Sequence, residues 1–399
     1  MSEKQLPREK KSRTKKIRKF SLKNNKKLRW AILIAVAVIV ILIVCTILFP
    51  CVFNFDRVRR YFRYLGIPDD GSYGSIRFDS NTTNSFAIFD GRFAVGCEDG
   101  LYLYNDDGEQ AALVQGALPY PKVCTGGSIA LCYSNESSTL VVMGKKGESL
   151  LSTTVSGTVL DAEVSRNGCV CYAASDSGCK TLVTVMNSDL KDIYRWRSFS
   201  QYINCCALSS DTSRLAVVGL NQSDGVFCSS ISILRTDAEE DAVIATQELG
   251  NQIIFELWFL QDNRICAIGE NSTLFFDASG NLLQEFSYDG QMLTDFTMNG
   301  SGDLFLALDG MGSGKDGMIV SFAANGDELA RMEFEDAVQS ISANGRYLAV
   351  LTKTELLVCD RKLEIYDRTQ DVPAANRALA RTDGTVMLVS NGQTTLYIP

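Results

Sequence analysis

Short apolar strands alternate with polar turns along the chain beyond residue 84, and one such unit recurs eight times. Each unit opens with a strand, a polar turn and a second strand rich in Ala and Val, as in 341–352, ISANGRYLAVLT. The turns are 36 to 50 residues apart, which is the blade period of a β-propeller with four strands per blade. The turn centres are Gly91, Gly127, Gly168, Ser213, Asn263, Gly302, Gly345 and Gly384.

The second half of most units has the pattern of a hairpin around an Asx or Gly turn, as in 274–286. The eighth unit is short and ends at Pro399 after most of a third strand, whereas residues 72–80 form a lone strand before the first unit. This lone strand can supply the missing outer strand of the last blade and close the ring. We therefore predict an all-β fold, a β-propeller of eight blades over 72–399, with seven blades as the alternative.

A run of 20 residues without a charge, Trp30–Phe49, precedes the repeats. At about 1.5 Å per helical residue it spans about 30 Å, the thickness of a bilayer core. It lacks the small residues of a signal-peptide cleavage site, so we predict a retained transmembrane helix over 30–50. The expected organisation is a basic cytoplasmic tail (1–29), this helix, a juxtamembrane amphipathic segment (51–71) and the propeller.

Charge is divided unequally along the chain. Residues 1–68 carry 17 Lys and Arg against 3 acidic residues, and residues 69–399 carry 22 against 44. Thirteen of the basic residues precede the apolar run, so we expect an extracytoplasmic propeller at the cell membrane and a tail that stays in the cytoplasm. The tail is either a topology signal alone or a site for anionic lipid or a cytoplasmic partner.

Residues 53–65 have the pattern of a short amphipathic helix. Val58, Tyr61, Phe62 and Leu65 fall on one face, and four arginines fall largely elsewhere. Such a helix is typical of a segment that lies at the membrane interface. The alternative is a stalk that continues the membrane helix.

Two motifs carry a family resemblance. The stretch Ser342–Val350 resembles the first hairpin of bacterial exported propellers, and the turn Asp277–Gly280 is similar to that of many propeller families. The whole layout resembles an uncharacterised family of single-pass, membrane-anchored β-propellers in Gram-positive, often anaerobic, bacteria. The resemblance implies fold and location and no activity.

Several chemistries lack support in the sequence. The chain has no His, which removes His-based triads and His metal ligands. The glycine-rich stretch 310–317, GMGSGKDG, lies between two predicted strands, whereas a dinucleotide fingerprint must open a helix. The acidic clusters lie at predicted turns, and a strongly acidic ring disfavours nucleic acid. We expect no catalytic residue, metal or cofactor.

The 13 cysteines contain no C-x-x-C pair, so paired zinc ligands and thioredoxin-like chemistry lack support. Five of them lie in or beside apolar strands, where a free Cys acts as a small hydrophobe: Cys169, Cys171, Cys205, Cys206 and Cys266. We expect mostly free, buried thiols. A disulfide among loop cysteines such as Cys179 and Cys228 stays open.

Loops between second and third strands share one face of a propeller with the connections between blades, and loops often carry function. Three of these loops are long or polar: 175–178, 221–225 and 309–317. The candidate partner-binding residues are Asp176, Asn221, Gln222, Asp224, Lys315 and Asp316.

The expected function is a non-catalytic scaffold that binds a protein partner at the cell surface. One alternative is an enzyme that acts on cell-wall carbohydrate or peptide through carboxylates alone, which requires two carboxyl groups about 5–10 Å apart. Another is a signal receptor with the tail as its output.

Overall fold

A computed structural model describes ten stretches of the chain and divides it into two units, Met1–Arg59 and Arg60–Pro399. The predicted tail lies outside the described residues, and so does most of the predicted membrane segment. Among the residues that are described, no helix is long and apolar enough to cross a bilayer. The described stretches are 30, 33–34, 36–37, 55–66, 74–79, 83–223, 225–238, 242–310, 315–372 and 374–399.

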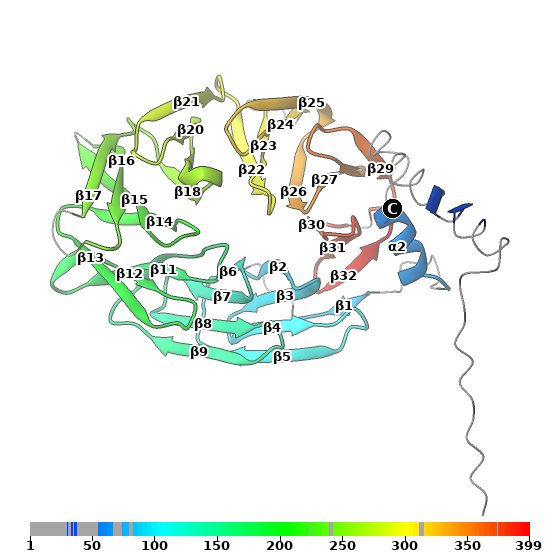
Figure 1. Cartoon of the computed structure of the whole chain (residues 1–399), viewed down its shortest axis with the longest axis horizontal. Helices are drawn as coiled ribbons and strands as arrows, with labels where there is room; N and C mark the ends of the chain where they lie inside the picture. The colour runs from blue at the N-terminus through cyan, green and yellow to red at the C-terminus, as the bar shows by residue number, and fades with distance from the viewer. Residues whose placement is uncertain are drawn as a thin grey trace, which may run out of the picture. The chain divides into compact units, whose positions relative to one another are not determined.

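Eight antiparallel sheets of four strands follow one another around a ring, each sheet forming one blade (Figure 1). The innermost strands are β2 (Ser85–Phe89), β6 (Pro121–Gly126), β10 (Val159–Val164), β14 (Tyr202–Leu208), β18 (Ile254–Phe259), β22 (Met292–Met298), β26 (Val338–Asn344) and β30 (Arg377–Ala380). The second strands are β3 (Arg92–Cys97), β7 (Ile129–Ser134), β11 (Val170–Asp176), β15 (Arg214–Ser223), β19 (Ile265–Gly269), β23 (Leu304–Asp309), β27 (Tyr347–Thr352) and β31 (Val386–Ser390).

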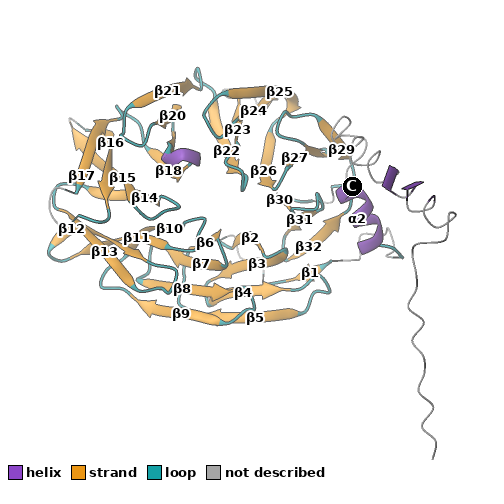
Figure 2. Ribbon diagram, viewed as in Figure 1, coloured by secondary structure: helices purple, strands orange, loops and turns teal. Residues whose placement is uncertain are grey.

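The outer half of each blade is a second hairpin. The third strands are β4 (Gly100–Tyr104), β8 (Thr139–Gly144), β12 (Cys179–Met186), β16 (Val226–Arg235), β20 (Ser272–Phe276), β24 (Lys315–Phe322), β28 (Leu356–Cys359) and β32 (Gln393–Tyr397). The outermost strands are β5 (Gln110–Gln115), β9 (Ser149–Thr154), β13 (Asp192–Ser198), β17 (Val243–Glu248), β21 (Leu282–Ser287), β25 (Glu328–Asp336), β29 (Ile365–Thr369) and β1 (Ile76–Arg77). Apart from these strands, Figure 2 shows the short 3-10 turn η1 (Gln261–Asn263) in blade 5.

The eighth blade is completed by the N-terminal strand. β1 pairs antiparallel with β32 in the register Ile76 to Thr394 and Arg77 to Gln393, so the first strand of the ring is the outer strand of the last blade. The predicted eight-bladed ring and its closure by residues 72–80 are confirmed, and the alternative of seven blades is wrong.

The blades are held together by apolar layers, one between each pair of neighbours. All six residues of strand β27 are buried, which explains why its sequence is continuously apolar. Leu348 and Val350 pack in the layer toward blade 6, and Ala349 and Leu351 pack in the layer toward blade 8. Because successive side chains of a strand point to opposite faces, a strand between two blades needs apolar residues at every position.

The turns that join first and second strands are packed backbone to backbone at one point. Gly127 has a φ of +56°, and a Cβ placed there would lie 2.7 Å from the backbone nitrogen of Gly168 in the next blade. Only glycine fits this position, because a side chain would meet the neighbouring turn and strain the backbone.

All eleven cysteines that the structure describes are free, and seven are buried. The five that were predicted in apolar strands are among the buried ones. Cys179 and Cys228 are half-buried and free.

The closure of the ring by β1 leads to a prediction about the free energy of unfolding. Ile76 is fully buried in the apolar layer between blades 8 and 1, so Ile76→Ala should lower the free energy of unfolding by about 2–5 kcal/mol. Arg77→Ala, in the same strand and exposed, is the matched control and should change it by less than about 0.5 kcal/mol. Urea denaturation of the purified protein measures both. Equal effects from the two substitutions would contradict the role of β1 in closure.

Candidate functional site

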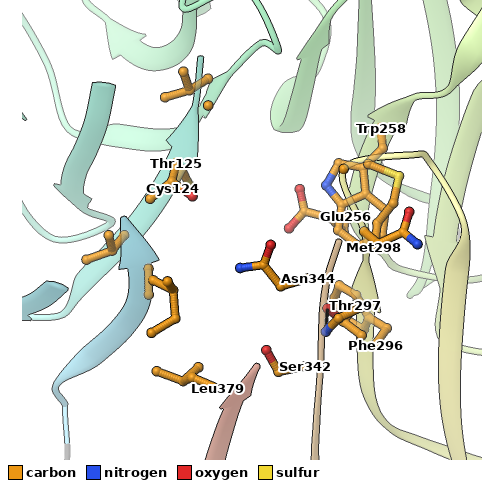
Figure 3. Close-up of a pocket in the computed structure, with 18 of the residues that line it drawn as sticks. Cys124, Thr125, Glu256, Trp258, Phe296, Thr297, Met298, Ser342, Asn344 and Leu379 are labelled. Carbon is orange, nitrogen blue, oxygen red and sulfur yellow. Dashed lines mark hydrogen bonds between the residues drawn. The ribbon is translucent and has the colours of Figure 1, made fainter. Parts of the chain in front are cut away.

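The innermost strands of all eight blades surround a central cavity of about 820 Å³. Figure 3 shows β6, with Cys124 and Thr125, on one side of it, and Glu256, Trp258 and Asn344 on the other. A cavity of this volume can hold a drug-sized ligand or a few residues of an extended peptide.

A repeated β-bulge fixes where polar side chains enter this region. In blades 3 to 7 the register between the first two strands shifts by one residue. The residue after each bulge occupies the equivalent position in its blade. In blade 4 this residue is Cys205, and in the other four blades it carries a side-chain oxygen, as Asp161, Glu256, Asp295 and Ser340.

At three of these positions the side chain joins two blades. A carboxylate oxygen of Asp161 accepts a hydrogen bond from the backbone N–H of Cys206 at 2.8 Å, and one of Asp295 accepts from the N–H of Ile341 at 2.8 Å. The Ser340 hydroxyl accepts in the same way from the next blade. Glu256 differs, because its carboxyl group points into the cavity (Figure 3).

The carboxyl groups of Glu256 and Asp161 are near enough for their charges to interact. Burial and the nearby Asp161 raise the pKa of Glu256 to about 8, against a partial lowering by Lys122. Burial also raises the pKa of Asp161, although hydrogen bonds from Cys206 and Tyr133 oppose it. A carboxyl group that is neutral near pH 7 can donate a hydrogen bond as well as accept one.

Glu163 lines the cavity beside this pair. Burial and the surrounding acidic groups raise its pKa well above the ordinary value. The group accepts a hydrogen bond from the backbone N–H of Leu208, and its Oε2 is buried without a hydrogen-bond partner. A buried oxygen without a partner is a position at which a ligand can donate a hydrogen bond.

The wall that carries Glu256 also contains apolar and amide groups. The rings of Trp258 and Phe296 meet edge to face at 5.6 Å, and Met298 and Asn344 lie near them (Figure 3). Together with the carboxyl groups, they suit a ligand that has both hydrogen-bond donors and an apolar part. Among the described residues, no three Cys, Asp or Glu side chains are grouped so that they could hold a metal ion.

The structure places three of the sequence-predicted residues, Asp176, Asn221 and Gln222, on one face, at the hairpins between second and third strands. Asp176 belongs to a tight turn, in which its Oδ1 accepts the N–H of Gly178 at 2.7 Å. Asn221 and Gln222 were predicted in a loop, but both lie in the extended hairpin of β15 and β16 and pair with Cys228 and Phe227. The loop prediction for these two residues is wrong, since the strands continue to Ser223 and Val226.

The remaining predicted residues are less fully described. Asp224 and the side chains of Lys315 and Asp316 lie outside the described part of the chain. The backbone at Lys315 belongs to β24, after β23, so the glycine-rich stretch does join two strands. The structure does not bring Asp176, Asn221 or Gln222 into the central cavity, because the cavity is lined by the innermost strands.

An apolar patch on this same face was missed by the sequence reasoning. It consists of Phe199, Tyr202, Val226, Phe227 and Phe255, which are 48% to 70% exposed. We call it the connection-face patch, because its members lie at connections between blades and at the tip of the β15–β16 hairpin. The sequence signal for this patch is that aromatic residues lie in or beside the connections around blade 4, at Phe199, Tyr202 and Phe255.

Backbone pairing places members of the patch on neighbouring strands. Tyr202 lies opposite Leu220 in the sheet of blade 4, and Phe227 lies opposite Gln222 farther along the same hairpin. The amide nitrogen of Asn204 donates to the backbone oxygen of Ile254 at 2.8 Å, which holds the start of β18, with Phe255, against blade 4.

The carboxyl cluster predicts a pH dependence of stability. Folded Glu256 keeps its proton up to a pKa of about 8, whereas an unfolded Glu loses its proton at about pH 4.3. The unfolded chain then binds fewer protons between these limits, so the free energy of unfolding falls as pH rises.

Glu256→Gln should make this fall shallower, by up to roughly 1.4 kcal/mol per pH unit. Glu270→Gln, at an exposed position, is the control and should leave the slope unchanged. Denaturation from pH 5 to 9 measures all three proteins, and a Glu256→Gln slope parallel to that of the parent would refute this electrostatic account.

Comparison with solved structures supports the propeller fold. The C-terminal WD40 domain of Sif2 is 12% identical, covers 81% of this chain and 97% of that chain, and has a TM-score of 0.54. BamB from Moraxella catarrhalis is 17% identical, with coverage of 81% and 95% and a TM-score of 0.48. At these identities the likeness to Sif2 shows the fold alone.

A search of curated proteins found no match to the chain. The model of one protein family, described as a family of unknown function, matches residues 72–395. This range contains β1 and the first three residues of β32, and so reaches all eight blades. The chain therefore belongs to that family of unknown function, DUF5711.

Proposed function

We propose that the protein is a membrane-tethered, extracytoplasmic β-propeller that acts as a non-catalytic protein-interaction scaffold. The observation that carries this proposal is the connection-face patch. Phe199 is 70% exposed, and four more large apolar side chains of the same patch are about half exposed. Exposed large apolar groups that gather on one face of a domain are typical of an interaction site.

The composition of the patch suits a protein partner. Aromatic residues are enriched at the centres of protein interfaces, where truncation costs the most binding energy. Asp176, Asn221 and Gln222 lie on the same face and provide a polar rim. Because residues 69–399 carry 44 acidic residues against 22 basic ones, the expected partner has an apolar centre flanked by basic groups.

The tether and its orientation are supported by the sequence. The uncharged run Trp30–Phe49 is long enough to cross a bilayer, and 13 Lys and Arg precede it. This distribution favours a cytoplasmic tail and a propeller on the outer side of the cell membrane.

Phe199→Ser combined with Phe227→Ser tests the scaffold. We expect the loss of a specific crosslinked protein, because truncation of two interface aromatics weakens binding by about 30-fold or more. Leu282→Ser combined with Ile365→Ser is the matched control, since both residues are about half exposed on outermost strands. Crosslinking in cells with quantitative mass spectrometry compares the three proteins. The scaffold proposal fails if the crosslinked set is the same for all of them.

A second candidate function is favoured by the cavity. Glu163 and Glu256 both line it with raised pKa values, and perturbed carboxyl groups in a cleft are candidates for general acid and base. A hydrolase of cell-wall carbohydrate or peptide would use such a pair. Hydrolysis that Glu256→Gln abolishes, with crosslinking unchanged, would favour the enzyme over the scaffold.

A further inference from the structure

The helix α2 (Phe55–Arg63) ends in residues that are fixed to the propeller. Arg60 is only 2% exposed, which is unusual for an arginine. Its guanidinium donates to the backbone oxygen of Asp383 and to the hydroxyl of Tyr366. It also lies 5.1 Å and 5.8 Å from the ring centres of Tyr366 and Tyr347, within the range of a cation–π interaction.

Asp383 is the centre of this contact. Its Oδ2 accepts from the hydroxyl of Tyr64 at 3.3 Å and pairs with Arg63 at 3.4 Å. Arg63 also pairs with Asp106 at 3.3 Å, and Asp106 pairs in turn with the buried Arg381. We call Arg60, Arg63 and Tyr64 the latch, because they join α2 to blades 7, 8 and 1 where the ring closes.

The latch lies on one identifiable face of the ring. Asp383 is in the turn between β30 and β31, and Asp106 is in the turn between β4 and β5. Turns after first and third strands lie on the face opposite the connections between blades, because successive strands of a blade are antiparallel. The latch and the connection-face patch are therefore on opposite faces of the propeller.

The side of the helix turned away from the latch is apolar and uncovered. Tyr61, Phe62 and Leu65 are 65%, 70% and 61% exposed, and the rings of Tyr61 and Phe62 meet edge to face at 5.7 Å. Because the latch holds the neighbouring residues Arg60 and Tyr64 against the ring, these three side chains are presented at a fixed position.

We propose that Tyr61, Phe62 and Leu65 bind the lipid interface, so that the propeller is mounted with its latch face toward the bilayer and its connection-face patch away from it. The uncharged run ends at Phe49, six residues before α2 begins, which leaves little chain between the bilayer and the helix. Tyr and Phe suit the headgroup boundary. Arg59, which is exposed in the same helix, adds a charge that attracts anionic headgroups.

The inference rests on the proposed membrane tether and adds an orientation to it. A flexible tether would let any face of the ring meet the membrane. A latched helix turns one face toward it and leaves the patch with Asp176, Asn221 and Gln222 free for a partner.

Brominated lipids, which quench nearby tryptophan, test this orientation. Phe62→Trp and Phe199→Trp are made separately in the full chain, which is reconstituted in vesicles of phosphatidylcholine and phosphatidylglycerol. The two positions are matched, since both phenylalanines are 70% exposed and they lie on opposite faces. Emission of the parent, with Trp30, Trp196 and Trp258, is subtracted, and thermal melting confirms that both variants are folded.

We expect brominated lipid to reduce the added emission of Phe62→Trp at least twofold and to leave that of Phe199→Trp unchanged. Equal quenching of both variants, or none at position 62 in vesicle-bound protein, would overturn the inference while the tether stands. Loss of the chain from the vesicles after an alkaline wash would instead refute the tether itself. If the emission of Phe62→Trp changes only when a soluble protein is added, this side of the helix binds a protein and not lipid, which would also overturn the inference.

Discussion

Every blade of this propeller depends on its neighbours to cover apolar faces. The second strand of blade 7 is buried at all six positions, and its alternate residues enter two different layers. A single blade would expose both layers, so only a closed ring removes all of this surface from water. The last blade lacks an outer strand in sequence order, and β1 supplies it. The segment that closes the ring is also the one that follows the latch, which brings α2 to the closure point.

The sequence predicts the ring because its signals are local. Turn residues recur at the blade period, and a lone strand at 72–80 complements a short last unit. The cavity is not local, since Glu163 and Glu256 are 93 residues apart in the sequence and meet only through the curvature of the ring. The sequence also does not predict the burial of Arg60. In the sequence it is one of four arginines on the polar face of a helix, whereas in the structure it is buried among aromatic rings.

The candidate site residues illustrate the same limit. Their common face follows from strand order, which the repeat reveals. The apolar patch beside them does not follow, because Phe199 and Phe227 belong to different segments of blade 4 and each resembles a scattered surface hydrophobe. Only the pairing of β14, β15 and β16 unites them. The result is a ring whose two faces differ in chemistry, with a basic latch on one and an apolar patch on the other.

The side of the membrane on which the ring lies is the central claim, and amine labelling tests it most directly. Intact cells are treated with a membrane-impermeant reagent, and the modified lysines are mapped by mass spectrometry. Lys145 and Lys146 are exposed on the ring, whereas nine other lysines lie in the tail before residue 28. The account predicts labelling of Lys145 and Lys146 in intact cells and of the tail only after permeabilisation. Labelling of the tail alone in intact cells would contradict it.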